Sequence, residues 1–269
     1  MIHVFTVAGN RPDFIPLQLR SLGKFLRDGF VFTVFNNAVF DRPHDSNEIR
    51  RVCAELGVLC IDVQRDYGLV ARCEALELRG DSKVFNHAGG YLNANVGAAY
   101  PSCWAWQGVI SKYREPVCFL HSDVFLTAEV SFEKHLAQTP LCYLPQAKEL
   151  NGVTVRYMWD AFILADLDRI PAPETINLWC GGVRGVPVDV GGQSAHYLEA
   201  HPDVPKLEMI GKHISEDSSC TTFAPANYEV FSFKGDADML HYRSGSNWDH
   251  KSDAYHGAKT EWLKARLGL

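Results

Sequence analysis

The sequence predicts an α/β fold in which a Rossmann-like, mostly parallel central sheet is flanked by helices. Two observations support this prediction. Apolar, β-branched runs alternate with segments of helical spacing through the first half of the chain, and such alternation implies parallel strands joined by right-handed crossovers. The chain also has 269 residues, of which 46% are hydrophobic, so it can bury a large core.

The first expected strand covers residues 2–7, a short apolar run that ends at the turn sequence AGNRP. Residues 14–26 follow, with apolar side chains at helical spacing and basic side chains on the opposite side. A second strand is expected over residues 31–35, where another apolar run ends at a pair of asparagines. These segments make one βα unit and the next strand of the sheet.

The second helix is expected over residues 46–56, with Ser46 as its N-cap. The third strand then covers residues 58–63. After a polar interval, residues 89–113 predict one long helix, or two helices broken near Pro101.

The next strand, residues 117–120, is apolar throughout, which indicates burial on both faces in the middle of a sheet. His121 and Asp123 follow at its carboxyl end, the edge at which open α/β sheets bind their ligands. Farther along, candidate strands cover 141–145, 153–158, 161–165, 228–233 and the pair Met239-Leu240, and a helix is expected over 193–200.

Composition argues against several classes of protein. The sequence has no run of eighteen apolar residues and no signal peptide features at its start, so we expect a cytoplasmic protein without a membrane span. Its 8 cysteines are scattered singly, which favours free thiols in a reducing compartment over disulfides or a zinc site. The net charge of −6 comes without a long block of either sign, which argues against a surface that coats nucleic acid.

Four segments carry a likeness to a known family: FTVAGNRPDFIPLQLRSL, FTVFNNAVFD, LNANVGAAY and CFLHSDVFL. In this order, over residues 2–130, they resemble the first strand and its Asn-Arg-Pro loop, the second strand, the Ala-x-Asn-x-Gly helix and the Asp-x-Asp strand end of family-2-like GT-A glycosyltransferases. The resemblance implies a single GT-A-type catalytic domain over residues 1–269. Its nucleotide-sugar-binding half would be 1–127, and its acceptor-binding half, an α+β portion, would be 128–269.

The resemblance implies a hexosyltransferase-type enzyme that moves a sugar from a nucleoside diphosphate donor to a hydroxyl acceptor. A glycan or small-molecule acceptor is favoured over nucleic acid, because the acceptor half is poor in lysine and arginine. The residues implied in nucleotide binding are Ala8, Gly9, Asn10, Arg11, Asn36, Asn37, Asp123 and Arg243.

The resemblance also implies a divalent cation, which neutralises the charge that develops on the leaving diphosphate. Asp123 matches the last aspartate of the family's motif, and His121 stands where the first aspartate is expected. His241, in the segment DMLHYRSGSNWDH, resembles the late histidine that some GT-A enzymes bring to the metal. Imidazole ligands suit manganese better than magnesium, so the implied site of His121, Asp123 and His241 favours Mn²⁺ over Mg²⁺.

Two aspartates are candidates for the general base. Asp189 lies in a glycine-rich segment similar to the one in which inverting GT-A enzymes place a carboxylate base, and Asp160, in RYMWDAF, is its rival. Trp159 and Trp248 are implied in acceptor binding, since an indole can stack on a sugar ring. Taken without the resemblance, Asp189 is equally typical of a helix N-cap, and Trp159 of a core residue.

Other functions remain open from the residues alone. A His-x-Asp pair with a distant histidine is also the facial triad of non-haem iron, 2-oxoglutarate-dependent oxygenases, although those enzymes are jelly rolls of antiparallel strands. A non-catalytic carbohydrate-binding protein would keep the aromatic residues but would not need His121, Asp123 and His241. A dinucleotide-binding oxidoreductase is disfavoured, because no G-x-G-x-x-G follows the first strand.

Overall fold

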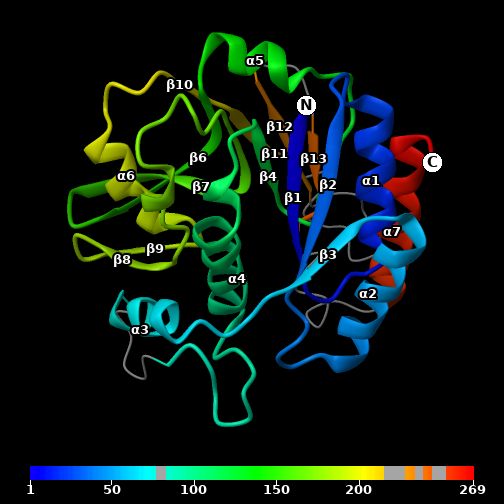
Figure 1. The fold of residues 1–269 in the computed structure, drawn as a ribbon, viewed down its shortest axis with the longest axis horizontal. Coiled ribbons are helices and arrows are strands. Elements are labelled where there is room, and N and C mark those ends of the chain that lie inside the picture. Colours follow the sequence, from blue (N-terminus) through cyan, green and yellow to red (C-terminus); the bar gives the residue numbers. More distant parts are fainter. Residues whose placement is uncertain (77–82, 215–227, 234–238, 244–252) are drawn as a thin grey trace.

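The computed structural model describes residues 1–76, 83–214, 228–233, 239–243 and 253–269 (Figure 1). The strands of its main sheet are β1 Ile2–Ala8, β2 Phe30–Asn36, β3 Leu59–Asp62, β4 Val117–Leu120, β6 Leu141–Leu150, β7 Val153–Ala165 and β10 Lys206–Glu208. Their order is β10-β6-β7-β4-β1-β2-β3. The pairs β1/β2, β1/β4, β2/β3 and β10/β6 are parallel, whereas β7 is antiparallel to both of its neighbours.

Helices cover both faces of this sheet, which confirms the predicted α/β fold with a mostly parallel central sheet (Figure 1). The helices are α1 Phe14–Phe25, α2 Pro43–Leu56, α3 Tyr67–Leu76, α4 Ala94–Gly108, α5 Phe132–Gln138, α6 Ala195–Ala200 and α7 Asp253–Leu267. On one face, α1 and α2 pack on the sheet through buried residues such as Ile15 and Ile49. On the other face, α3 and α4 do so through Leu69 and Trp106. Among the described residues, no helix has the length and apolarity that crossing a bilayer requires.

Strand β4 lies inside the sheet, between β7 and β1. Val117 and Phe119 belong to the core on one face, and Cys118 and Leu120 belong to the core on the other. The unbroken apolar run is therefore explained by burial on both faces, as expected from the sequence.

A second sheet brings the C-terminal part of the chain to the end of β4. Its strands are β5 Val124–Leu126, β11 Ile210–Ile214, β12 Tyr228–Ser232 and β13 Met239–His241. Their order is β11-β12-β13-β5, with antiparallel pairing throughout. Because β13 pairs with β5, His241 lies opposite Val124. Val124 is the first residue after the turn that follows β4, so His241 lies beside that turn. A small hairpin of β8 Gly181–Val183 and β9 Val186–Val188 forms a separate two-stranded sheet, and its valines pack with Val155 and Tyr157 of β7.

Some predicted boundaries are wrong. Helix α2 begins at Pro43, so Ser46 is not its N-cap but a buried residue within it. Proline suits the first helical position because its fixed φ matches the helix and its missing N–H would have no partner there. The candidate strands 153–158 and 161–165 are one strand, β7. Its residues 160–162 form a bulge opposite β6, because the pairing passes from Tyr143/Ile163 directly to Leu144/Trp159.

Helix α4 is a single helix that runs through Pro101. A proline lacks an N–H, so it leaves the carbonyl four residues earlier without its helical partner. That carbonyl belongs to Gly97, and it accepts a hydrogen bond from Asn37 Nδ2 at 2.8 Å. At the start of the helix, the side chain of Asn93 accepts from the Val96 N–H at 3.0 Å. The helix therefore stays continuous because a side chain beyond the end of β2 replaces the missing bond.

Candidate active site

The turn between β4 and β5 carries His121 and Asp123, and it is held by two other parts of the fold. Gln18 on α1 is buried and donates its side-chain amide to the carbonyls of His121 at 2.8 Å and Val124 at 2.9 Å. The Asp123 carbonyl accepts from the backbone N–H of Tyr242, just after β13, at 2.8 Å. The two functional side chains therefore project from a fixed turn.

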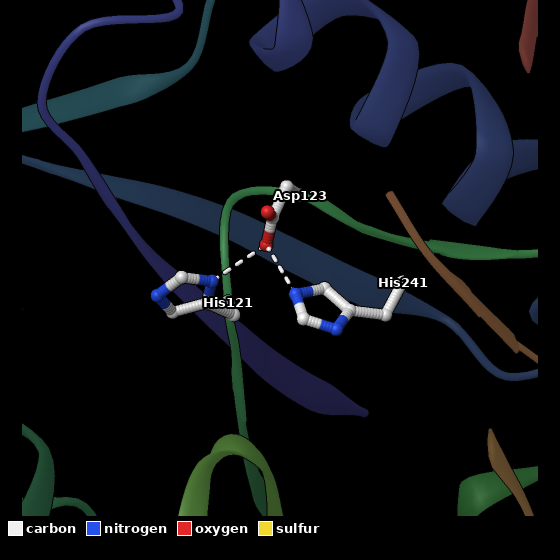
Figure 2. A group of neighbouring side chains, drawn as sticks. All are labelled: His121, Asp123 and His241. Carbon is white, nitrogen blue, oxygen red and sulfur yellow. Dashed lines mark hydrogen bonds and ion pairs between the residues drawn. The ribbon is translucent and has the colours of Figure 1, made fainter. Parts of the chain in front are cut away.

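The imidazoles of His121 and His241 both face the carboxylate of Asp123 (Figure 2). Asp123 Oδ1 lies 2.6 Å from His121 Nδ1 and 3.2 Å from His241 Nε2. One ligand atom from each residue lies within 4.8 Å of the others, so the group could hold a metal ion. The structure thus brings together the three residues of the predicted metal site, which we call the triad. His121 is 22% exposed, whereas Asp123 and His241 are buried, so the triad opens on the His121 side.

Burial and mutual attraction set the charges of the triad. Burial opposes ionisation of Asp123, but the two histidines outweigh it and hold the pKa of its carboxyl well below the usual range. Burial likewise opposes protonation of His241, but Asp123 and Glu229 outweigh it and raise the pKa to about 9. The pKa of His121 is also raised, because Asp123 outweighs its burial. Asp123 is therefore an anion, the state in which a carboxylate binds a cation.

A cavity of about 320 Å³ lies beside the triad, and His121 forms part of its wall. We call it the first cavity. Of the residues predicted to bind a nucleotide, Gly9, Asn10 and Asn37 line it. Asn93, the N-cap of α4, lines it as well. Because a helix N-terminus favours anions, this cavity suits a ligand that carries phosphate.

Asn37 shapes the first cavity through both ends of its side-chain amide. Its Nδ2 donates to the Gly97 carbonyl of α4, and its Oδ1 accepts from the Tyr91 hydroxyl. Tyr91 also lines the cavity, and its ring lies 5.2 Å from that of Phe85 and 6.1 Å from that of Tyr100. This wall is therefore tied to β2, to α4 and to an aromatic cluster at once.

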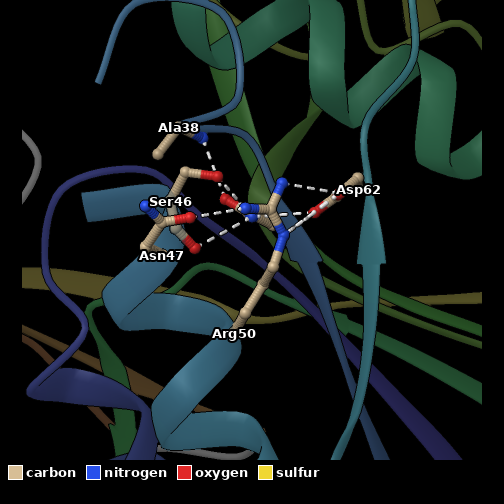
Figure 3. Close-up of polar contacts among 6 residues, drawn as sticks. Ala38, Ser46, Asn47, Arg50 and Asp62 are labelled. Atoms are coloured by element: carbon tan, nitrogen blue, oxygen red, sulfur yellow. Dashed lines mark hydrogen bonds and ion pairs between the residues drawn. The ribbon is translucent and has the colours of Figure 1, made fainter. Parts of the chain in front are cut away.

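Asn36, in contrast, is fully buried and serves the fold. Its Nδ2 donates to Ser46 Oγ at 2.9 Å and to Asp62 Oδ1 at 2.8 Å. Its Oδ1 accepts from the Ala38 N–H at 3.2 Å. Arg50 extends the network, because its Nη2 lies 2.8 Å from Asp62 Oδ2 (Figure 3). The network ties β2, α2 and β3 together and explains why Ser46 is buried.

The other residues predicted to contact the nucleotide lie elsewhere. Ala8 is buried in the core of the sheet. Arg11 is 5% exposed and donates to Thr260 Oγ1 on α7 at 3.0 Å. The Nε atom of Arg243 lies 3.9 Å from Glu229 Oε1. In the part of the chain that the structure describes, these three residues do not line the first cavity, and their contact with a nucleotide stays a prediction.

The two candidate bases have different surroundings. Asp160 on β7 is buried and accepts from Ser102 Oγ at 3.0 Å, and burial raises its pKa. Asp189 is half-buried and lines a second cavity of about 540 Å³, together with Lys148. The N-cap of the following short helical turn is Gly191, so Asp189 does not cap it.

The second cavity adjoins the first, because Asn93 and Ala94 line both. Trp159 is half-buried, and its ring lies 5.3 Å from that of His241 at a steep angle. Trp248, the other residue predicted to contact the acceptor, lies outside the described residues. The structure therefore places Trp159 against the triad.

Sequence reasoning missed two residues that hold the triad. Glu229 Oε2 lies 2.7 Å from His241 Nδ1, and Gln18 holds the turn after β4. Each could have been noticed as a polar residue in an apolar setting: Glu229 within YEVFSF, and Gln18 on the apolar stripe of FIPLQLRSL. Their partners could not have been identified, because each contact joins segments distant in the chain.

The sequence matches no protein-family model and no curated protein. The structure is similar to solved glycosyltransferases. One is the galactosyltransferase LgtC in complex with donor and acceptor sugar analogs, at 13% identity and a TM-score of 0.38 over 62% of this chain and 58% of that chain. Another is the mannosyltransferase Ktr4p from S. cerevisiae, at 11% identity and a TM-score of 0.38 over 65% and 58% of the two chains. Mouse xyloside xylosyltransferase 1 matches at 10% identity and a TM-score of 0.40 over 76% and 84%.

The chain thus spans 58% of the length of LgtC and of Ktr4p. All three structures are glycosyltransferases, the class of enzyme that the four sequence segments resemble.

Proposed function

We propose that the protein is a metal-assisted glycosyltransferase of the hexosyltransferase type, which moves a sugar from a nucleoside diphosphate to a hydroxyl group of a glycan or small molecule. One observation supports this proposal above the others. His121 belongs both to the triad and to the wall of the first cavity. A molecule bound in that cavity therefore meets the open side of the metal site.

The donor set of the triad fits a divalent transition metal. Two imidazoles and one carboxylate favour manganese over magnesium, which prefers oxygen ligands. Asp123 is already an anion, whereas His241, with a pKa of about 9, has to release a proton when a cation binds. A cation bound there would supply the positive charge that stabilises a leaving diphosphate.

The first cavity is the proposed donor site. Gly9 and Asn10 line it from the loop after β1, and Asn37 lines it from the loop after β2. The N-terminal end of α4 adds backbone N–H groups and the positive end of the helix dipole, both of which favour a diphosphate. The neighbouring carboxyl ends of parallel strands are also where α/β sheets bind nucleotides.

The second cavity is the proposed acceptor site, with Asp189 as the general base. Asp189 takes the proton from the attacking hydroxyl, and its partial exposure allows that contact. Asp160 is buried against Ser102, so orienting its neighbours suits it better than proton transfer. In this proposal the chain is one catalytic domain, with donor binding in residues 1–127 and acceptor binding in residues 128–269.

A cytoplasmic setting is part of the same proposal. The described cysteines are free thiols, and most of them are buried. Free thiols are typical of proteins from reducing compartments.

One observation favours a second candidate function, that of a non-haem iron oxygenase. The triad has the two-histidine, one-carboxylate composition of that class. The seven-stranded, mostly parallel sheet supports the transferase instead, because those oxygenases are antiparallel jelly rolls.

Binding experiments separate the two functions. We expect one of UDP, GDP, CDP or dTDP to bind in calorimetry when Mn²⁺ is present, and 2-oxoglutarate with Fe²⁺ to leave the melting temperature unchanged. Asp123→Asn should weaken the Mn²⁺-dependent binding by more than about tenfold. His196→Ala, an exposed histidine on α6, is the control and should bind like the parent. Absence of binding by every nucleotide would remove the transferase proposal.

A further inference from the structure

His241 has a hydrogen-bonding partner at each of its two ring nitrogens. Its Nε2 lies 3.2 Å from Asp123 Oδ1, and its Nδ1 lies 2.7 Å from Glu229 Oε2. Glu229 stands on β12 directly opposite His241 on β13, so the contact is set by the register of an antiparallel pair. The strand pairing of the second sheet therefore places the two side chains next to each other.

The surroundings leave the imidazole little freedom to turn. The rings of Trp159 and Phe231 lie 5.3 Å and 5.5 Å from it. Glu229 itself is 20% exposed, and Arg243 Nε lies 3.9 Å from its other oxygen. A carboxylate held in this way can fix both the orientation of the ring and the nitrogen that carries the proton.

We propose that Glu229 is the positioning residue of the metal site. It accepts a hydrogen bond from Nδ1–H of His241, so that the unprotonated Nε2 points toward Asp123 and is presented to the cation. The carboxylate also makes the imidazole a stronger donor to the metal, as carboxylate partners of ligating histidines generally do. This inference rests on the proposed metal-assisted function, and it assigns to Glu229 a role at the ligand rather than at the substrate.

The effect of Glu229 on metal affinity differs between two cases: in one, Glu229 positions His241, and in the other, it acts only through its negative charge. If Glu229 acts through His241, its effect on metal affinity has to vanish once that imidazole is gone. If it acts only as a negative charge near the site, its effect has to persist. The two cases can be distinguished by a double-mutant cycle.

The test measures Mn²⁺ affinity of the full chain by electron paramagnetic resonance, without substrate. Glu229→Met removes the acceptor oxygen at similar side-chain length, and we expect it to weaken Mn²⁺ binding by about 10- to 100-fold. Glu229→Gln keeps an oxygen that accepts from Nδ1–H, so it should restore most of the affinity. Glu208→Met is the matched control. Glu208 forms an ion pair with Arg156 at 2.7 Å and does not belong to the triad, so this variant should bind Mn²⁺ like the parent.

In a His241→Ala background, Glu229→Met should change the affinity by less than about twofold. An equal loss in both backgrounds would overturn the proposal, as would parental affinity of Glu229→Met. If Glu229→Met does not fold, Glu229→Ala removes the same oxygen and takes its place in the cycle. If the parent protein binds no Mn²⁺, the metal-assisted function is overturned as well. If the parent and Glu229→Met bind Mn²⁺ equally, only the role of Glu229 is overturned.

Discussion

Asp160 and Asp189 are the two candidate bases, and burial separates their roles. Asp160 is enclosed on β7 with Ser102 as its hydrogen-bond donor, whereas Asp189 faces the second cavity. A general base has to reach the hydroxyl that it deprotonates. Exposure to the cavity therefore favours Asp189.

Replacing Asp189 tests this assignment. We expect Asp189→Asn to fold and to bind the donor nucleotide like the parent, but to transfer sugar roughly a hundredfold to ten-thousandfold more slowly. Asp160→Asn should mainly raise the KM for the acceptor. Steady-state kinetics and the anomeric configuration of the product provide the measurement. Near-parental turnover of Asp189→Asn would contradict the assignment. A product that keeps the anomeric configuration of the donor would contradict an inverting transfer, in which the acceptor hydroxyl attacks the anomeric carbon directly.

The raised pKa of Asp160 also has a consequence for stability. Burial favours its protonated form, so the folded state binds this proton more tightly than the unfolded state does. Stability is therefore lost as pH rises from the unfolded pKa of about 3.9 toward the folded one. Asn at this position keeps an acceptor for Ser102 and carries no charge.

We therefore expect Asp160→Asn to raise the melting temperature at pH 7, and the gain to fade near pH 4, where the unfolded carboxyl also takes up its proton. Scanning calorimetry across this pH range measures it. Asp168→Asn, an exposed aspartate paired with Arg114 at 3.6 Å, is the control and should change little. A gain that is constant with pH would show that the charge of Asp160 is not its cause.

The residues of the triad could be identified from the sequence, whereas their supports could not. His121 and Asp123 follow an unmistakable buried strand, and family likeness pointed to His241. Glu229 and Gln18 act through contacts across the second sheet and between α1 and the turn, which no local spacing encodes. Asn36 and Asn37 were both assigned to nucleotide binding, but their positions differ. Asn37 lines the first cavity, whereas Asn36 is hydrogen-bonded to Asp62 within the fold.

At the scale of elements, α4 depends on a side chain from outside the helix. Pro101 removes one helical hydrogen bond, and Asn37 supplies a donor to the Gly97 carbonyl in its place. The same helix lines both cavities with its first residues. The bond between Asn37 and Gly97 thus links the stability of α4 to the shape of the proposed donor site.

A pair of substitutions tests this link. Asn37→Ala leaves the Gly97 carbonyl unpaired and should cost about 1–3 kcal/mol of unfolding free energy. In a Pro101→Ala background the helix regains its own N–H donor, so the same substitution should cost much less. Chemical denaturation of the four proteins gives the comparison, and an equal cost in both backgrounds would rule out the compensation.

Elements with a clear apolar run or spacing were predicted, whereas three-residue strands and several helices were not. The strands β1 to β4 and helix α1 were expected close to their observed bounds because their apolar runs or spacing are clear, whereas α2 begins earlier than expected, at Pro43, and α4 is shorter than the expected 89–113. Strands β8, β9 and β10 have three residues each, too few to show a period. Helices α3, α5 and α7 were also missed, and their positions depend on packing against the rest of the fold.

At the scale of the whole molecule, the main sheet joins the two halves of the chain. Strands β1 to β4 come from the first half, and β6, β7 and β10 come from the second. The central strand β4 pairs with β1 on one side and with β7 on the other. Neither half can complete this sheet alone.

Thermal unfolding should therefore be a single cooperative transition, with equal calorimetric and van't Hoff enthalpies. A fragment of residues 1–127 should not give a cooperative transition, because it would expose the buried edge of β4. Differential scanning calorimetry of the full chain and of the fragment checks both expectations. Two resolved transitions in the full chain would contradict them.

The two cavities meet at Asn93 and Ala94 but are otherwise lined by different residues. Two occupants can therefore be accommodated side by side, and neither has to depart before the other arrives. Such an arrangement is typical of enzymes that bind both substrates in a ternary complex. It does not require a covalent intermediate in which the sugar is attached to the protein before the acceptor binds. Plots of reciprocal velocity against reciprocal donor concentration, taken at several acceptor concentrations, should accordingly intersect rather than run parallel.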